Sequence, residues 1–266
     1  MTILDKVLIH KQREIEKLHD REKAGELPEI TAYLKGKMVD APHSFKKAME
    51  EKPFNIIAEI KRCSPSRGEI AKIENPEKLA KQYELGGASA LSILTDRKYF
   101  GGSIEDIRKV RQVVKIPILR KDFIMDKIQI AESASEGASC ILLIVKALKE
   151  ETKDLFDFAT SIGMDVLVEI HNTVELELAI DIKTEIIGVN NRNLETFQTD
   201  LEASLKLAPI IPNHMVRIAE SAIFNEDDIK RVKEAGYNGA LVGQALIESE
   251  NPRHLIREFL KAAEDE

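Results

Sequence analysis

From Ile56 onward, short apolar segments alternate with charged segments along the chain. The apolar segments are rich in β-branched residues, and several have no alternation of apolar and polar positions, which is typical of parallel strands covered on both faces. They span residues 56–58, 90–94, 116–119, 140–145, 166–170, 186–189, 215–219 and 240–243. Consecutive segments therefore start 20 to 34 residues apart, which is the length that a strand, a helix and two loops require.

The charged segments between these strands have the periodicity of helices. We predict helices over residues 75–85, 103–114, 126–136, 148–161, 173–180, 201–208, 226–234 and 252–263. Pro76 suits the first turn of the first helix, and Gly87 and Gly137 suit left-handed turns after helix ends. Eight strand–helix units predict a (β/α)8 barrel. An open doubly wound sheet is the alternative, but it usually has fewer strands and a glycine-rich first turn, which this chain lacks.

Residues 1–54 have a different pattern. Apolar positions separated by three, four and seven residues predict an amphipathic first helix, and they are Ile3, Leu4, Val7, Leu8, Ile15 and Leu18. Residues 24–42 contain Gly and Pro and predict a connector with at most short structure. Ser44 can cap a short helix that carries Phe45 and Met49 on one face. We therefore predict a helical extension over residues 1–54 and a barrel over residues 55–266.

Composition restricts the classes of partner. The chain has 46 acidic and 39 basic residues, a net charge of −7 that gives no support to non-specific nucleic-acid binding. Two cysteines are too few for a disulfide framework or a cysteine-based zinc site. The charged N-terminal segment is unlike a signal peptide, and no segment approaches the roughly 20 apolar residues of a membrane helix. We expect a soluble, cytoplasmic protein with no nucleic-acid or membrane partner.

Polar side chains stand where the predicted strands end, which in a barrel is the face that carries active sites. These strand-end residues are Glu59, Lys61, Lys121, Glu169, Asn190, Arg192 and Glu220. Buried unpaired charges cost several kcal/mol, so a cluster of them indicates chemistry more than stability. Nearby carboxylates keep a lysine protonated, and such a lysine can donate a proton while a glutamate accepts one. The pattern predicts a general acid–base site.

Two further features concern the same rim. His171 ends the fifth strand, but no second histidine stands at metal-ligand spacing, so we expect a solvent-facing or supporting role and no metal. Small residues follow the seventh and eighth strands, where barrels often bind phosphate, and small residues allow an anion to approach closely. For Gly243 alone, a tight strand-to-helix turn without a ligand is the simpler interpretation.

Residues 59–68 resemble the E-x-K-x-x-S-P-S signature of the indole-3-glycerol phosphate synthase family. The resemblance covers roughly residues 55–262 and includes the segments 95–103, 119–124, 168–171, 188–192 and 219–221. It implies a (β/α)8-barrel enzyme of tryptophan biosynthesis whose N-terminal extension packs over the catalytic rim. It also implies a monomer that needs no cofactor.

The resemblance implies a carboxy-lyase reaction on 1-(2-carboxyphenylamino)-1-deoxyribulose 5-phosphate. The ring carbon that bears the carboxylate attacks the sugar ketone, CO₂ and then water leave, and indole-3-glycerol phosphate forms. Lys121 matches the general acid of ring closure, Glu169 the acid–base group of dehydration, and Lys61 a lysine that holds anionic groups and can share the acid role. The remaining matches are Glu59 and Glu220 as orienting carboxylates, Asn190 and Arg192 around the anthranilate part, Ser64 in a binding loop, and Ser221, Ala222, Gly243 and Gln244 around the phosphate. The sequence leaves open which lysine donates the first proton.

Three positions depart from the family pattern. Ala222 stands where glycine is common, Gln244 where serine is common, and Asn193 where aspartate is frequent. A methyl group at residue 222 would crowd a phosphate, or would restrict the backbone if φ there is positive. These departures bear on substrate affinity more than on the reaction type.

Two alternatives remain at this point. A related barrel isomerase, such as phosphoribosylanthranilate isomerase, would pair a cysteine base with an aspartate acid and would lack the extension. A barrel that only binds a phosphorylated ligand would not need Lys121 and Glu169 together.

Overall fold

The computed structural model describes residues 2–39, 44–65, 67–193 and 198–264. Eight parallel strands form a closed barrel in which neighbours follow chain order and the last strand pairs with the first. They are β1 (Asn55–Ile60), β4 (Ala90–Leu94), β5 (Ile118–Lys121), β6 (Cys140–Ile144), β7 (Asp165–Ile170), β8 (Ile186–Asn190), β9 (Val216–Glu220) and β10 (Gly239–Val242). Closure removes both sheet edges, and it confirms the barrel over the open sheet.

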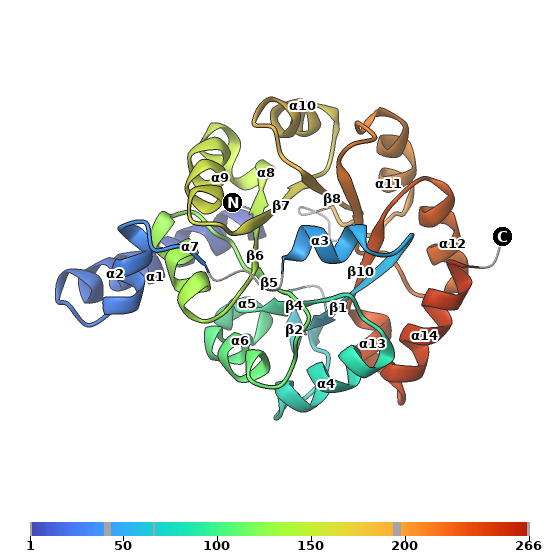
Figure 1. Ribbon diagram of the computed structural model, residues 1–266, viewed down its shortest axis with the longest axis horizontal. Coiled ribbons are helices and arrows are strands. Elements are labelled where there is room, and N and C mark those ends of the chain that lie inside the picture. Colours follow the sequence, from blue (N-terminus) through green and yellow to red (C-terminus); the bar gives the residue numbers. More distant parts are fainter. Residues whose placement is uncertain (1, 40–43, 66, 194–197, 265–266) are drawn as a thin grey trace.

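Helices surround the barrel in a ring (Figure 1). They are α4 (Pro76–Gly86), α6 (Ile104–Arg111), α7 (Lys127–Ser135), α9 (Thr152–Ser161), α10 (Thr173–Asp181), α11 (Glu202–Leu207), α12 (Glu226–Glu234) and α14 (Pro252–Ala262). Each overlaps a predicted helix, although the segment predicted over 148–161 divides into the end of α8 (Val145–Leu148), a 3-10 turn and α9. Capping boxes start α7 at Asp126 and α12 at Asn225, and Gly87 ends α4 at φ 104°.

The N-terminal residues form α1 (Ile3–Lys23), α2 (Pro28–Leu34) and α3 (Phe45–Glu50). α2 lies in the segment predicted as a connector, of which residues 40–42 fall outside the described part, and it packs against α7. α3 crosses the end of the barrel where the strands begin (Figure 1). Its Phe45 and Met49 are fully buried against inward-facing residues such as Ile57 and Leu119. Ser44 fixes this helix by donating to the Asp165 carboxylate at 2.9 Å.

Short elements follow several strands at the opposite end. They are the hairpin of β2 (Cys63–Ser64) and β3 (Gly68–Glu69), α5 (Arg97–Phe100), α8 and α13 (Gln244–Glu248). Apart from the last residue of α8, none of them was predicted, because two to five residues are too few to show a periodic pattern. Ser66 of the signature lies outside the described residues. Within the part that the structure describes, no helix is long and apolar enough to cross a membrane.

Candidate active site

A pocket opens where the barrel strands end. Among the predicted site residues, it is lined by Glu59, Lys61, Ser64, Lys121, Glu169, Asn190, Arg192, Ser221, Ala222, Gly243 and Gln244. Glu220 lies just behind the wall, fully buried, and accepts a hydrogen bond from Lys121. The structure therefore brings all of the predicted site residues together from six strands and the loops that follow them.

Ion pairs connect the two lysines through Glu59. Lys61 Nζ lies 2.6 Å from Glu59 Oε1, while Lys121 Nζ lies 2.7 Å from Glu220 Oε2 and 3.5 Å from Glu59 Oε2. Burial alone would lower the pKa of Lys121, but the carboxylates of Glu220, Glu59 and Glu169 raise it above its usual range. Burial alone would raise the pKa of Glu59, but Lys61 and Lys121 lower it to about 2. Lys121 is thus a cation, able to donate a proton or stabilise an oxyanion.

The pKa of Glu220 is shifted in the opposite direction from that of Glu59. Burial raises its pKa to about 7, and the neighbouring Glu169 and Glu59 act in the same direction against the attraction of Lys121. Its Oε1 has no hydrogen-bond partner among the described residues. A carboxyl group that can take up a proton near neutral pH therefore stands behind the proposed acid.

Two glycines make room for these carboxylates. A Cβ at Gly188 would lie 2.1 Å from Glu220 Oε1, and a Cβ at Gly243 would lie 2.4 Å from Glu59 Oε1. Any side chain at either position would displace a carboxylate of the site. Gly243 was predicted from the phosphate motif, whereas Gly188 was missed, although a single glycine inside a strand signals a close approach.

The turn after β9 has an unusual backbone. Ser221 and Ala222 have φ values of 64° and 60°, a region that non-glycine residues rarely adopt. Asn191 holds this turn, since its Nδ2 donates to the carbonyl oxygens of Glu220 at 3.0 Å and Ser221 at 3.2 Å. Sequence reasoning assigned no role to Asn191, and the pairing of β8 with β9 brings it to this turn.

After β10, the Gln244 amide points to Glu248. Gln244 Nε2 lies 3.1 Å from Glu248 Oε1, and Arg67 Nη1 lies 2.8 Å from the same oxygen. Two groups that could donate to an anion are therefore both held by one carboxylate. Any phosphate bound here would compete with Glu248 for them.

An apolar wall closes the other side of the pocket. Ile3, Leu4 and Val7 of α1 line it, together with Phe100 and Phe123, whose ring centroids lie 6.2 Å apart. Among the helices of the extension, α1 forms part of the pocket, whereas α3 lies at the far end of the barrel. This wall suits a flat aromatic group.

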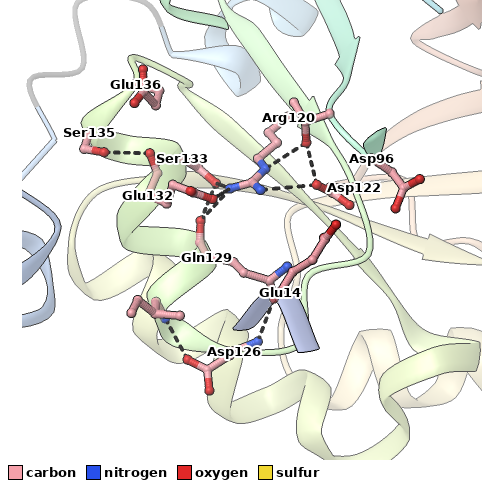
Figure 2. Close-up of polar contacts among 12 residues, drawn as sticks. Glu14, Asp96, Arg120, Asp122, Asp126, Gln129, Glu132, Ser133, Ser135 and Glu136 are labelled. Atoms are coloured by element: carbon pink, nitrogen blue, oxygen red, sulfur yellow. Dashed lines mark hydrogen bonds and ion pairs between the residues drawn. The ribbon is translucent and has the colours of Figure 1, made fainter. Parts of the chain in front are cut away.

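Buried ion pairs attach α1 to this end of the barrel. Lys11, 2% exposed, lies 3.1 Å from Asp96 Oδ2 and 2.9 Å from Asp122 Oδ1. Asp122 also pairs with Arg120, which α7 holds through Glu132 and further contacts (Figure 2). Burial alone would raise the pKa of Asp122, but Lys11 and Arg120 lower it to about 2. Sequence reasoning missed Lys11, although a lysine four residues from both Val7 and Ile15 interrupts the apolar stripe.

No metal centre is formed in the described part of the chain, where no three His, Cys, Asp or Glu side chains gather as ligands. His171 lies beside Glu169, with its side chain 12% exposed. Of the two roles left open for it, the structure favours the supporting one.

A (β/α)8 barrel that gathers two lysines and three glutamates at the ends of its strands defines an enzyme with an acid–base centre. A family model described as "Indole-3-glycerol phosphate synthase" matches residues 4–259. The chain belongs to this family of carboxy-lyases, which confirms the family, the fold and the enzyme class that the sequence predicted. The assignment sets the isomerase alternative aside.

Relatives of the same name match most of the chain. The indole-3-glycerol phosphate synthase of Nocardioides sp. is 40% identical over 258 residues, which is 97% of each chain. That of Kineococcus radiotolerans is 45% identical over 214 residues, 80% of this chain and 78% of the relative. Among solved structures, tryptophan synthase subunit alpha from Legionella pneumophila is similar in fold alone, with a TM-score of 0.62, 13% identity, and coverage of 82% of this chain and 97% of that one.

Proposed function

We propose that this chain converts 1-(2-carboxyphenylamino)-1-deoxyribulose 5-phosphate to indole-3-glycerol phosphate, CO₂ and water without a cofactor. The observation that carries the proposal is the position of Lys121. This half-buried cation lines a pocket that also has an apolar wall, and it lies within reach of two carboxylates. That combination suits a substrate with an aromatic ring and a ketone that must be protonated.

Lys121 is the general acid of ring closure in this proposal. As the ring carbon bonds to the ketone carbon, the ketone oxygen takes a proton from Nζ and becomes a hydroxyl group. The bond to the carboxylate then breaks, and its electron pair restores the aromatic ring as CO₂ leaves. Glu59 and Glu220 keep the ammonium oriented, since both contact it directly.

Glu169 serves the dehydration step. It takes a proton from the ring carbon that adjoins the hydroxyl-bearing carbon. A carbon–carbon double bond then forms between these two carbons, and the hydroxyl leaves as water with a proton from a lysine. Lys61 is the second candidate for that proton, because it is tied to Glu59 at 2.6 Å and lines the same pocket.

Substrate binding divides between the two sides of the pocket. We place the anthranilate part against the apolar wall, with Asn190, Arg192 and Ser64 around its polar groups. We place the phosphate on Ser221, Ala222, Gly243 and Gln244, where small side chains follow β9 and β10. We further propose that the protein acts as a monomer in the cytoplasm, and that residues 1–54 and 55–266 fold as one domain.

The test is an assay of the purified protein with this substrate, without added metal or cofactor, followed by indole fluorescence. Lys121→Met should reduce turnover by about 100-fold or more, the usual contribution of a general acid. Lys206→Met is the matched control, since Lys206 is exposed on α11 outside the barrel. If Lys121→Met keeps full turnover and Lys61→Met does not, the acid is Lys61. A folded wild-type protein that forms no indole product would favour a barrel that only binds its ligand.

A further inference from the structure

His171 and Glu169 face each other at the end of β7. His171 Nε2 lies 3.5 Å from Glu169 Oε1, and the two side chains are 12% and 2% exposed. Both atoms are buried, and neither forms a hydrogen bond with any described residue, so the 3.5 Å contact is the polar contact that they share. Buried polar atoms normally have a hydrogen-bond partner, so each of these two atoms needs the other to satisfy it.

Glu175 fixes the opposite edge of the imidazole ring. Its Oε2 accepts a hydrogen bond from the His171 backbone N–H at 2.7 Å and lies 3.1 Å from Nδ1. Asn172 Nδ2 donates to the other oxygen of Glu175 at 2.8 Å. Because a carboxylate can only accept, Nδ1 carries a hydrogen, and the ring is held with Nε2 toward Glu169.

This orientation fixes how a proton is shared. With Nδ1 protonated, Nε2 of a neutral ring presents a lone pair, which would repel an ionised Glu169. One proton must therefore lie between Nε2 and Oε1, on the imidazole or on the carboxyl group. The charged groups around the ring are Glu169 on β7, Glu175 on α10 and Lys146 on α8. Burial alone would lower the pKa of His171, but the two carboxylates raise it against the opposition of Lys146.

We propose that His171 is a positioning residue that takes the proton of Glu169 through Nε2 and returns it during turnover. The inference rests on the proposed dehydration role of Glu169. When Glu169 accepts the proton from the substrate carbon, the proton already held between the two side chains moves fully to Nε2. His171 is then an imidazolium ion between the protonated Glu169 and the Glu175 carboxylate. Glu169 releases the substrate proton to solvent through the pocket that it lines, and the imidazolium returns the shared proton before the next turnover.

Single-turnover assays of two His171 variants test the proposal, because slow product release cannot hide the chemical step in them. His171→Gln places an amide near the Nε2 position that can donate to Glu169 but cannot exchange a proton. His171→Asn keeps a donor for Glu175 and leaves Oε1 without a partner. We expect the rate constant to fall about tenfold in His171→Gln and further in His171→Asn, with KM within about twofold. The pH–rate profile of His171→Gln should also lose one ionisation.

His19→Gln is the matched control, since His19 is paired with Asp126 at 3.1 Å outside the pocket and should leave rate and profile unchanged. A wild-type rate and pH profile in His171→Gln would overturn the proposal, and so would losses of rate that only follow a lower unfolding temperature. Nitrogen NMR of the imidazole gives a readout without substrate, because the titration of His171 should move to lower pH in Glu169→Gln. Unchanged titration would contradict the shared proton. Wild-type turnover, measured in the same series, tests the proposed function separately.

Discussion

Ala222 combines a left-handed backbone with a buried methyl group. Its φ is 60°, and the side chain packs against the main hydrophobic core. A left-handed conformation costs a residue other than glycine roughly 1–2 kcal/mol. The positive φ, which would restrict the backbone at an alanine, is therefore present at residue 222. Asn191 at the end of the neighbouring strand holds the turn in place.

We predict that Ala222→Gly leaves the free energy of unfolding within about 0.5 kcal/mol of the wild type. Relief of strain, roughly 1–2 kcal/mol, is offset by about 0.8 kcal/mol for the lost methyl group and by about 0.5–1 kcal/mol of chain entropy. KM should fall, because glycine lets the backbone of this turn adjust to the phosphate, which the left-handed alanine restricts. Urea unfolding and steady-state kinetics measure the two effects.

Ala90→Gly provides the comparison, because Ala90 is fully buried in β4 and has an ordinary strand backbone. It gains no relief of strain and should lose about 1.5 kcal/mol. Equal losses at both positions would show that the turn at residue 222 is not strained.

The strand-end rule found most of the acid–base residues because chemistry and topology coincide in a barrel. Each polar residue that ends an apolar segment is carried to the same rim, so Lys121 and Glu220 meet although they are 99 positions apart. The residues that sequence reasoning missed matter because of contacts between segments far apart in the chain, and no local sequence pattern shows such contacts. Gly188 matters only because the Glu220 carboxylate lies against it, and Lys11 only because α1 crosses two loops. The raised pKa of Glu220 likewise depends on burial and on neighbours from other strands.

Helix α1 is held by charge as well as by apolar contacts. Lys11 contacts acidic residues that follow two different strands, Asp96 after β4 and Asp122 after β5. Asp122 directly follows Lys121 in the chain, so this contact joins the helix to the loop that carries the proposed acid. Ile3, Leu4 and Val7 line the pocket from the same helix.

We predict that Lys11→Met lowers the free energy of unfolding by about 3 kcal/mol, since removing one partner leaves buried carboxylates uncompensated. KM should rise because α1 no longer holds its apolar residues against the pocket. Urea unfolding and the indole assay report the two changes.

Lys17→Met is the control on the same helix, because Lys17 is exposed, and it should change stability by less than about 0.5 kcal/mol. A Lys11→Met protein with wild-type stability and KM would mean that apolar packing alone places α1.

The regular elements were predictable and the loop elements were not, for a physical reason. The helices around the barrel have 6 to 11 residues, which is long enough for their apolar face to appear as a periodic pattern in the sequence. The β2–β3 hairpin and α5 are too short to show a period, and they depend on the strands on which they stand. The sequence therefore predicts the barrel strands and their helices well, and it predicts the loops around the pocket only through their motifs.

The two ends of the barrel differ in composition. Where the strands begin, Phe45 and Met49 of α3 fill the interior with apolar contacts. Where they end, Glu59, Lys121 and Glu220 occupy positions that apolar residues would fill more stably. Stability is concentrated at one end and chemistry at the other, as expected of a barrel enzyme.

The acidic groups at the pocket end make the stability of the whole molecule depend on pH in two opposite ways. The pKa of Glu59 is lowered from 4.5 to about 2, so its contribution is present above about pH 4.5 and is lost as the pH falls toward 2. The pKa of Glu220 is raised from 4.5 to about 7, so its contribution is present below about pH 4.5 and is lost as the pH rises through 7.

We therefore predict that Glu220→Gln affects stability little at about pH 5 and stabilises the protein at about pH 8, relative to the wild type. At the lower pH the amide resembles the protonated carboxyl group, whereas at the higher pH it removes a buried charge that burial and two neighbouring carboxylates oppose. Urea unfolding at both pH values measures the difference, with Glu202→Gln on the exposed face of α11 as the control that should show no such change. A difference between Glu220→Gln and the wild type that stays the same at both pH values would mean that Glu220 does not take up its proton in this range, and that the pair with Lys121 stays fully ionised.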